Sequence, residues 1–136
     1  MSQYNHDMPN KITIGKTAAV SVTVDERNTA RGVGSGSLDV FATPMMVALM
    51  ECAACEALSG TLEPGQTSVG TEINISHSAA SPLGAVVTAT ATVTGVNGRK
   101  IEFEVNARDE AREIGNGTHA RAVVDEVKFM AKLSKK

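Results

Sequence analysis

The stretch that decides the fold runs from residue 42 to residue 58 and reads Ala-Thr-Pro-Met-Met-Val-Ala-Leu-Met-Glu-Cys-Ala-Ala-Cys-Glu-Ala-Leu. Methionine, alanine and leucine dominate it, and these residues favour a helix. Thr43 fits the N-cap, Pro44 fits the first helical position, and Ser59-Gly60 supplies the end. Because its interior is apolar on nearly every face, we expect this helix to be buried.

Few polar residues interrupt the apolar helix. Glu56 lies near its end and can reach solvent. Cys52 and Cys55 form a C-x-x-C string without a turn or a second pair, so we interpret them as buried apolar thiols. Glu51 lies about two turns inside, where a carboxylate is costly unless it is paired, hydrogen-bonded or functional. Glu51 is therefore the first catalytic candidate, and a bond to a backbone N–H or a buried arginine is the alternative.

Strand patterns surround the helix. Alternating apolar and polar residues predict strands over residues 17–24, 67–79, 85–96, 99–109 and 114–131. Asn97-Gly98 indicates a type I′ hairpin between two of them. Gly115 and Gly117 suggest bulges in the last strand. One apolar helix followed by strands with one apolar face predicts an α+β fold, in which a curved antiparallel sheet wraps the helix.

Length and charge limit the remaining possibilities. A chain of 136 residues is interpreted as one domain, with loose ends at residues 1–10 and 133–136 and a mobile loop at residues 25–36. The net charge of −2 and the absence of a basic stripe argue against nucleic-acid binding. The helix is short for a membrane span and carries Glu51, so we expect no membrane insertion. Free thiols and the lack of a signal peptide favour the cytoplasm.

Three further side chains could carry chemistry. His77 lies in phase with the apolar residues of its predicted strand, either as a core histidine or as a group that transfers protons near neutral pH. His119 and Arg121 lie two apart on one strand face, either as a surface pair or with the arginine aimed at an anionic ligand. Metal-spaced acidic clusters, Gly-rich phosphate loops and G-x-S-x-G or H-E-x-x-H motifs are absent from the sequence. We therefore expect no metal site.

The chain carries an ordered set of short motifs. They are Val40-Phe41-Ala42-Thr43, Leu49-Met50-Glu51, Leu62-Glu63-Pro64-Gly65, Gly70-Thr71, His77, Ala79-Ala80, Pro82 and the run from Glu113 to Val123. This set resembles the fluoroacetyl-coenzyme A thioesterase family, a branch of the hotdog-fold acyl-CoA thioesterases, and the resemblance runs from about Val40 to Lys132.

This resemblance implies a hotdog fold with five or six strands and a homodimer with active sites at the interface; a tetramer stays open. The family's catalytic residues correspond to Thr43, Glu51 and His77. Substrate contacts correspond to Gly70, near the thioester oxygen, and Arg121, and we add the neighbouring His119. The expected reaction is hydrolysis of a small acyl-CoA, with Glu51 as nucleophile or as general base. The coenzyme A is part of the substrate, and no cofactor is expected.

One departure from the family concerns acyl specificity. The segment that forms an aromatic lid in the resembled enzyme corresponds here to residues 25–39, which are fewer, rich in glycine and lack phenylalanine. We therefore predict thioester hydrolysis without selectivity for fluoroacetyl-CoA. The alternative function is a non-catalytic acyl-CoA-binding or sensor module on the same fold. The presence of Thr43, Glu51 and His77 together favours the enzyme.

Overall fold

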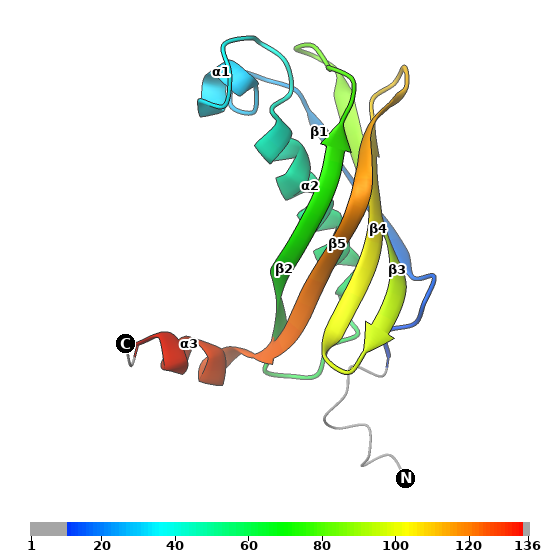
Figure 1. Ribbon diagram of the computed structural model, residues 1–136, viewed down its shortest axis with the longest axis vertical. Coiled ribbons are helices and arrows are strands. Elements are labelled where there is room, and N and C mark those ends of the chain that lie inside the picture. The colour runs from blue at the N-terminus through cyan, green and yellow to red at the C-terminus, as the bar shows by residue number, and fades with distance from the viewer. Residues whose placement is uncertain (1–10, 135–136) are drawn as a thin grey trace.

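The computed structural model describes residues 11–134 of the chain. Five antiparallel strands form one sheet in the order β1-β3-β4-β5-β2. The strands are β1 (Thr17–Thr23), β2 (Gln66–His77), β3 (Val86–Asn97), β4 (Lys100–Arg108) and β5 (Glu113–Asp125), and the helices are α1 (Ala30–Val33), α2 (Thr43–Leu58) and α3 (Glu126–Ser134). The sheet curves around α2, while α1 and α3 lie at opposite ends of the molecule (Figure 1). The predicted α+β architecture is confirmed, with five strands.

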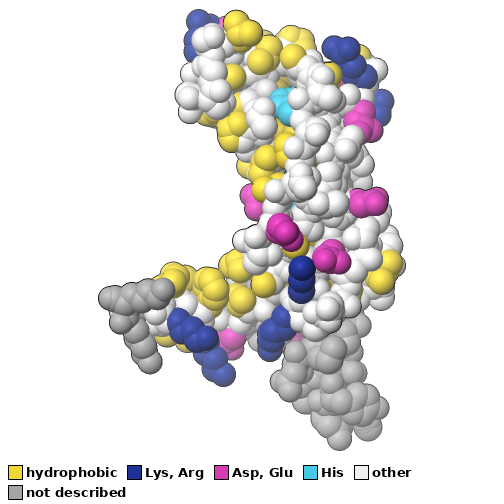
Figure 2. Space-filling model, viewed as in Figure 1, with side chains coloured by type: hydrophobic (Ala, Val, Ile, Leu, Met, Phe, Trp, Pro, Cys, Tyr) yellow, Lys and Arg dark blue, Asp and Glu magenta, His cyan; other side chains and the backbone are white. Residues whose placement is uncertain are grey.

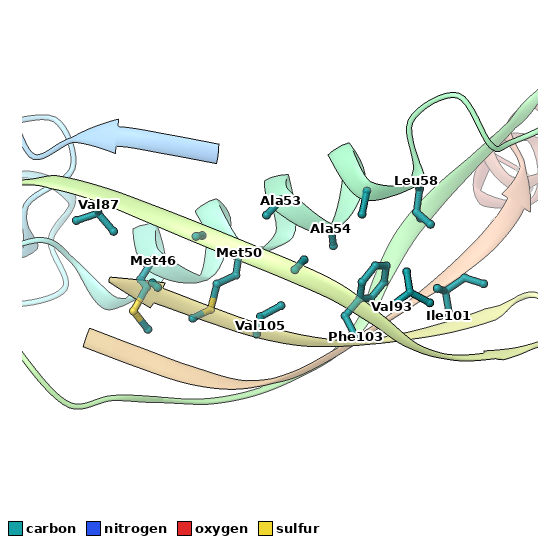
Figure 3. Close-up of a cluster of buried hydrophobic side chains, with 14 of the residues drawn as sticks. Met46, Met50, Ala53, Ala54, Leu58, Val87, Val93, Ile101, Phe103 and Val105 are labelled. Carbon is teal, nitrogen blue, oxygen red and sulfur yellow. The ribbon is translucent and has the colours of Figure 1, made fainter. Parts of the chain in front are cut away.

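The core lies between α2 and the concave face of the sheet. Strand β4 shows the pattern most clearly, because its alternate side chains Ile101, Phe103, Val105 and Ala107 are buried while the residues between them point outward. Alanines and valines of β3 fill the same layer (Figure 3). The helix contributes Met46, Met50, Ala53, Ala54, Ala57 and Leu58.

Only one face of α2 is buried, so the prediction of a helix buried all round is wrong. Ala48, Cys52, Cys55 and Glu56 are exposed, and both thiols are free. The five-stranded sheet covers one side of the helix, and small residues such as alanine and cysteine are tolerated on the other side. Glu51 is half exposed rather than enclosed by aliphatic neighbours.

The start of α2 also differs from the prediction. Thr43 is the first helical residue, and Ala42 is the N-cap, without a side-chain cap bond. Pro44 therefore occupies the second helical position, where its missing N–H is still harmless. The Thr43 hydroxyl is left available for another partner.

Three loops and ends were predicted incompletely. The segment at residues 25–36 is predicted as a loop without regular structure, but it contains the helix α1. The N-cap Thr29 of α1 accepts a hydrogen bond from the Gly32 N–H at 3.1 Å. Residues 97–100 form the β3–β4 turn, and Gly98 is the one residue among them with a positive φ. A type I′ turn needs a positive φ at both central residues, so the prediction of type I′ is wrong. The last strand ends at Asp125 instead of residue 131. The Asp125 carboxylate accepts a hydrogen bond from the Lys128 N–H at 2.9 Å at the start of α3.

The two chain ends that the sequence predicts to be loose lie mostly outside the described residues. Residues 1–10 and 135–136 lie outside the described residues, whereas Leu133 and Ser134 belong to α3. Within residues 11–134, none of the helices is long and apolar enough to cross a membrane.

Candidate active site

The Thr43 and His77 side chains meet at one end of the sheet. Thr43 comes from the first turn of α2 and His77 from the end of β2, and the Thr43 Oγ lies 2.8 Å from the His77 Nδ1. The pair borders a cleft of about 280 Å³ that is also lined by Phe41 and Ala79. Burial lowers the pKa of His77 below its usual range, although the nearby backbone of Ala79 opposes this effect. The imidazole is therefore neutral at physiological pH.

The second ring nitrogen of His77 is unusual. Its Nε2 is buried and has no hydrogen-bond partner among the described residues. Buried polar atoms are nearly always hydrogen-bonded, and the exceptions need an explanation. A partner for this atom would have to come from a group that enters the cleft and displaces the atoms now covering the Nε2.

Glu51, Gly70 and Arg121 form a second cluster, farther along α2 and β2. The Glu51 carboxylate lies so close to Gly70 that a Cβ added there would be 2.6 Å from its Oε2. The same carboxylate lies 3.7 Å from the Arg121 guanidinium, whose side chain is 8% exposed against 41% for Glu51. A carboxyl group, a guanidinium and a glycine backbone thus meet in this cluster.

Arg121 is held on three sides. Its Nε donates to the Ser68 Oγ at 2.8 Å, and its Nη2 donates to the Ser68 carbonyl at 3.1 Å. Its Nη1 lies 3.2 Å from the His119 Nε2. The guanidinium therefore has a fixed orientation beside Glu51. Ser68 was not predicted, and its position two residues before Gly70 on β2 was the only signal that could have indicated it.

His119 is buried against the Arg121 guanidinium, so the alternative of a surface pair is wrong. Its Nδ1 lies 2.7 Å from the Glu72 carbonyl, which only accepts, so the proton is on Nδ1 and Nε2 accepts from Arg121. Burial lowers the pKa of His119, the Glu72 carbonyl and Glu51 oppose this effect, and the Arg121 charge adds to it. His119 is thus a neutral acceptor that orients the arginine.

Backbone geometry explains why glycines occur here. The β2–β5 register shifts between Gly70 and Glu72, so Thr71 is an extra, bulged residue beside the second cluster. Gly115 and Gly117 show no such shift against β2; a Cβ at Gly115 would be 2.7 Å from Met46, so this glycine permits close helix packing. The bulge predicted at these two glycines is instead next to Gly115, where the β4–β5 register shifts.

The six predicted site residues thus form two groups in one protomer. Thr43 pairs with His77, and Glu51 lies with Gly70, Arg121 and His119. Eight helical residues separate Thr43 from Glu51, which is about 12 Å. A single thioester carbonyl cannot contact both groups within one protomer. Residues 11–134 contain no cluster of three or more His, Cys, Asp or Glu side chains that could hold a metal ion.

Comparisons with known proteins identify relatives of this chain. The profile of the fluoroacetyl-CoA-specific thioesterase family matches residues 24–127. The fluoroacetyl-CoA thioesterase of Streptantibioticus cattleyicolor is 49% identical over 98 residues, which cover 72% of this chain and 70% of that protein.

Solved structures show the same fold. A structure of the fluoroacetyl-CoA thioesterase FlK is 40% identical and covers 91% of this chain and 96% of its own, with a TM-score of 0.85. A thioesterase superfamily member from Thermus thermophilus, TTHA0967, is 26% identical, covers 91% of this chain and 92% of its own, and also has a TM-score of 0.85. The family profile, the curated relative and the hotdog fold lead to one conclusion: the chain belongs to the fluoroacetyl-CoA-specific thioesterase family.

Proposed function

We propose that this thioesterase hydrolyses a small acyl-CoA at a site shared by two protomers of a homodimer. One protomer supplies Glu51, Gly70 and Arg121, and its partner supplies Thr43 and His77. The observation that carries the proposal is the division of the site residues within one protomer, together with the unpartnered Nε2 of His77. A cytoplasmic location and the absence of a cofactor belong to the same proposal.

The open edge of β2 supports a dimer. This strand has 12 residues and, within residues 11–134, pairs with β5 alone, so its other side carries backbone groups that no described strand pairs. Residues 70–74 of β2 are exposed, and the strand contains neither lysine nor proline to discourage pairing. Such an edge is a template for another strand unless something protects it.

A two-fold axis through this edge would join the two groups. Identical strands related by an axis perpendicular to the sheet run antiparallel, and the interface uses the same surface on both copies. If the axis passes between Ile73 and Asn74, Gly70 lies opposite the partner's His77. Neighbouring strands are about 4.8 Å apart, so both groups could then contact one substrate carbonyl.

Each residue has a chemical task in this arrangement. The Gly70 N–H stabilises the oxyanion that forms on the thioester carbonyl, and Arg121 adds positive charge nearby. Glu51 either attacks the carbonyl, releasing the CoA thiolate and forming an anhydride that water cleaves, or removes a proton from an attacking water. The partner's His77, oriented by Thr43, delivers a proton to the leaving thiolate or positions the water.

The test is complementation between two inactive variants. Glu51→Ala and His77→Ala are purified separately, mixed, exchanged through mild denaturant and assayed for thiol release from acetyl-CoA. A mixed dimer contains one intact shared site, because each variant keeps the residues that the other lacks. Since half of the dimers are mixed and each regains one of two sites, we expect about a quarter of the wild-type rate.

Two controls make the result decisive. Mixing Glu51→Ala with Thr43→Ala should also restore activity, whereas mixing His77→Ala with Thr43→Ala should not, because these two residues belong to the same half. Failure of every mixture, despite active wild-type enzyme and demonstrated exchange, would contradict the shared site. Wild-type protein that binds acyl-CoA without releasing thiol would favour the sensor function instead.

A further inference from the structure

Helix α3 carries an apolar surface that the described part of its own protomer does not cover. Val127, Met130 and Leu133 are spaced along one side of the helix and are 76%, 58% and 50% exposed. We call these three residues the α3 patch. Lys128, Phe129 and Lys132 instead line a groove of about 470 Å³ between the helix and the body of the protomer. The α3 patch therefore faces away from the chain that carries it.

A helix of this length needs a partner surface. It has nine residues, none of them buried, and isolated helices shorter than about 12 residues are marginal in water. Most of the stability of such a helix comes from packing its apolar side. The patch therefore indicates that another surface completes the packing of α3.

The position of α3 indicates which surface this is. Gln66 at the start of β2 pairs with Asp125, so α3 begins beside the open edge of β2. In Figure 1, α3 projects beyond this edge at one end of the molecule, and α1 projects to the same side at the other end. Figure 2 shows the hollow between them, with hydrophobic side chains of α3 facing the hollow and its lysines on the opposite side.

A second apolar patch lies at the α1 end of the same hollow. Val33, at the end of α1, and Leu38, in the following loop, are 39% and 65% exposed. We call these two residues the α1 patch. The loop that carries them is closed by a hydrogen bond from the Arg31 N–H to the Leu38 carbonyl at 3.0 Å and by the Arg31–Asp39 ion pair. The α1 patch is therefore presented by an internally bonded loop.

We propose that α3 docks through its patch onto the α1 patch of a second copy of this chain. The inference rests on the proposed homodimer, because antiparallel pairing of two β2 edges brings the α3 end of one copy to the α1 end of the other. A two-fold interface requires each contact to occur twice. The α3 patch and the α1 patch lie at opposite ends of the β2 edge, so each copy's α3 patch can meet the other copy's α1 patch.

Docking also has a consequence for the active site. Ala30, Ser35 and Val40, from the segment that carries the α1 patch, line the Thr43–His77 cleft of that protomer. Helix α3 of the other copy therefore lies next to the entrance of this cleft and limits water access to it. The contact between two copies would therefore help to exclude water from the cleft, as an aromatic lid does.

The test is a cross-link that only two copies can form. Leu38→Cys and Met130→Cys are combined in a chain carrying Cys52→Ser and Cys55→Ser, and the protein is treated with a short bis-maleimide. Residues 38 and 130 lie at opposite ends of one protomer, so a link between them joins two chains (Figure 1). We expect at least tenfold more covalent dimer than with the matched control Leu38→Cys with Lys128→Cys, whose α3 position faces its own protomer.

Sedimentation of the same variants before cross-linking tests dimer formation separately from the docking of α3. A dimer that cross-links through positions 38 and 130 supports the docking. A dimer by sedimentation without that cross-link overturns the docking but leaves the shared active site standing. A monomer at all concentrations overturns both. Met130→Glu provides a second measurement, and it should raise the dimer dissociation constant at least tenfold while Lys128→Glu does not.

Discussion

At the residue scale, the space beside Gly70 in the candidate site is too small for a side chain. A Cβ at Gly70 would be 2.6 Å from the Glu51 Oε2 and 3.4 Å from both Arg121 and His119. The Arg121 guanidinium cannot move away from the added Cβ, because Ser68 and His119 hold it by hydrogen bonds. An added methyl group would therefore displace the carboxylate, which is the reacting group of the proposed mechanism.

Gly70→Ala should lower kcat about 100-fold while leaving the fold intact. A displacement of about 1 Å at a reacting group can cost this much, and alanine is readily accepted in a strand. Thiol release and urea unfolding measure the two effects. Gly95→Ala is the matched control, because its Cβ would lie 2.7 Å from the Glu102 carboxylate, whose side chain is 55% exposed and can move aside into solvent. Equal losses in both variants would contradict the assignment.

At the scale of elements, α1 lies in the segment that corresponds to the aromatic lid of the resembled enzyme. Residues 25–39 contain no phenylalanine, and Phe41 is the aromatic residue among those that line the cleft. Because the cleft offers little to distinguish fluorine from hydrogen, kcat/KM for acetyl-CoA and fluoroacetyl-CoA should agree within about tenfold. A panel of acyl-CoAs measures this ratio. A strong preference for fluoroacetyl-CoA would show that another element provides the selectivity.

The elements with strong periodicity were predictable from the sequence. The alternation in β4 and the apolar composition of α2 gave both the type and the approximate ends of these elements, because burial on one face determines each pattern. Helix α3 was not predicted. Its residues Val127, Phe129 and Ala131 also fit a strand that continues β5, and only the Asp125 cap distinguishes the two.

The site was harder to predict for a different reason. The local sequence predicts Thr43 as an N-cap, yet its hydroxyl contacts His77, which is 34 residues away along the chain. Likewise, Glu51 pairs with Arg121 through a contact between α2 and β5. Such contacts depend on how the elements pack, which local patterns do not specify. The resemblance supplied the site residues, but it did not supply their division into two groups.

At the scale of the whole molecule, the buried His119 and the partly buried His77 link stability to pH. Burial lowers the pKa values of His77 and His119. The unfolded chain binds protons at these groups below about pH 6.5, while the native state remains neutral until lower pH. The free energy of unfolding should therefore decrease as the pH falls from about 6.5 through the lowered pKa values. Asp25 and Asp109, whose pKa values are also lowered, contribute only below about pH 4.

Urea unfolding between pH 7.5 and pH 5 measures this linkage. The midpoint should fall with pH in the wild-type protein and change much less in a His77→Gln, His119→Gln double variant. The double variant is expected to be less stable at pH 7.5, since it loses hydrogen bonds, so the slope with pH is the informative quantity. Parallel slopes would show that the two imidazoles do not stay neutral in the folded chain.

The exposed thiols of α2 have a practical consequence for kinetics. Cys52 and Cys55 are free and accessible. The CoA product is also a thiol, so a disulfide reagent that detects CoA will react with the enzyme itself. An initial burst of up to two equivalents per chain would then imitate the accumulation of an acyl-enzyme. A Cys52→Ser, Cys55→Ser enzyme removes that background, and any burst that remains would be evidence for Glu51 as the nucleophile.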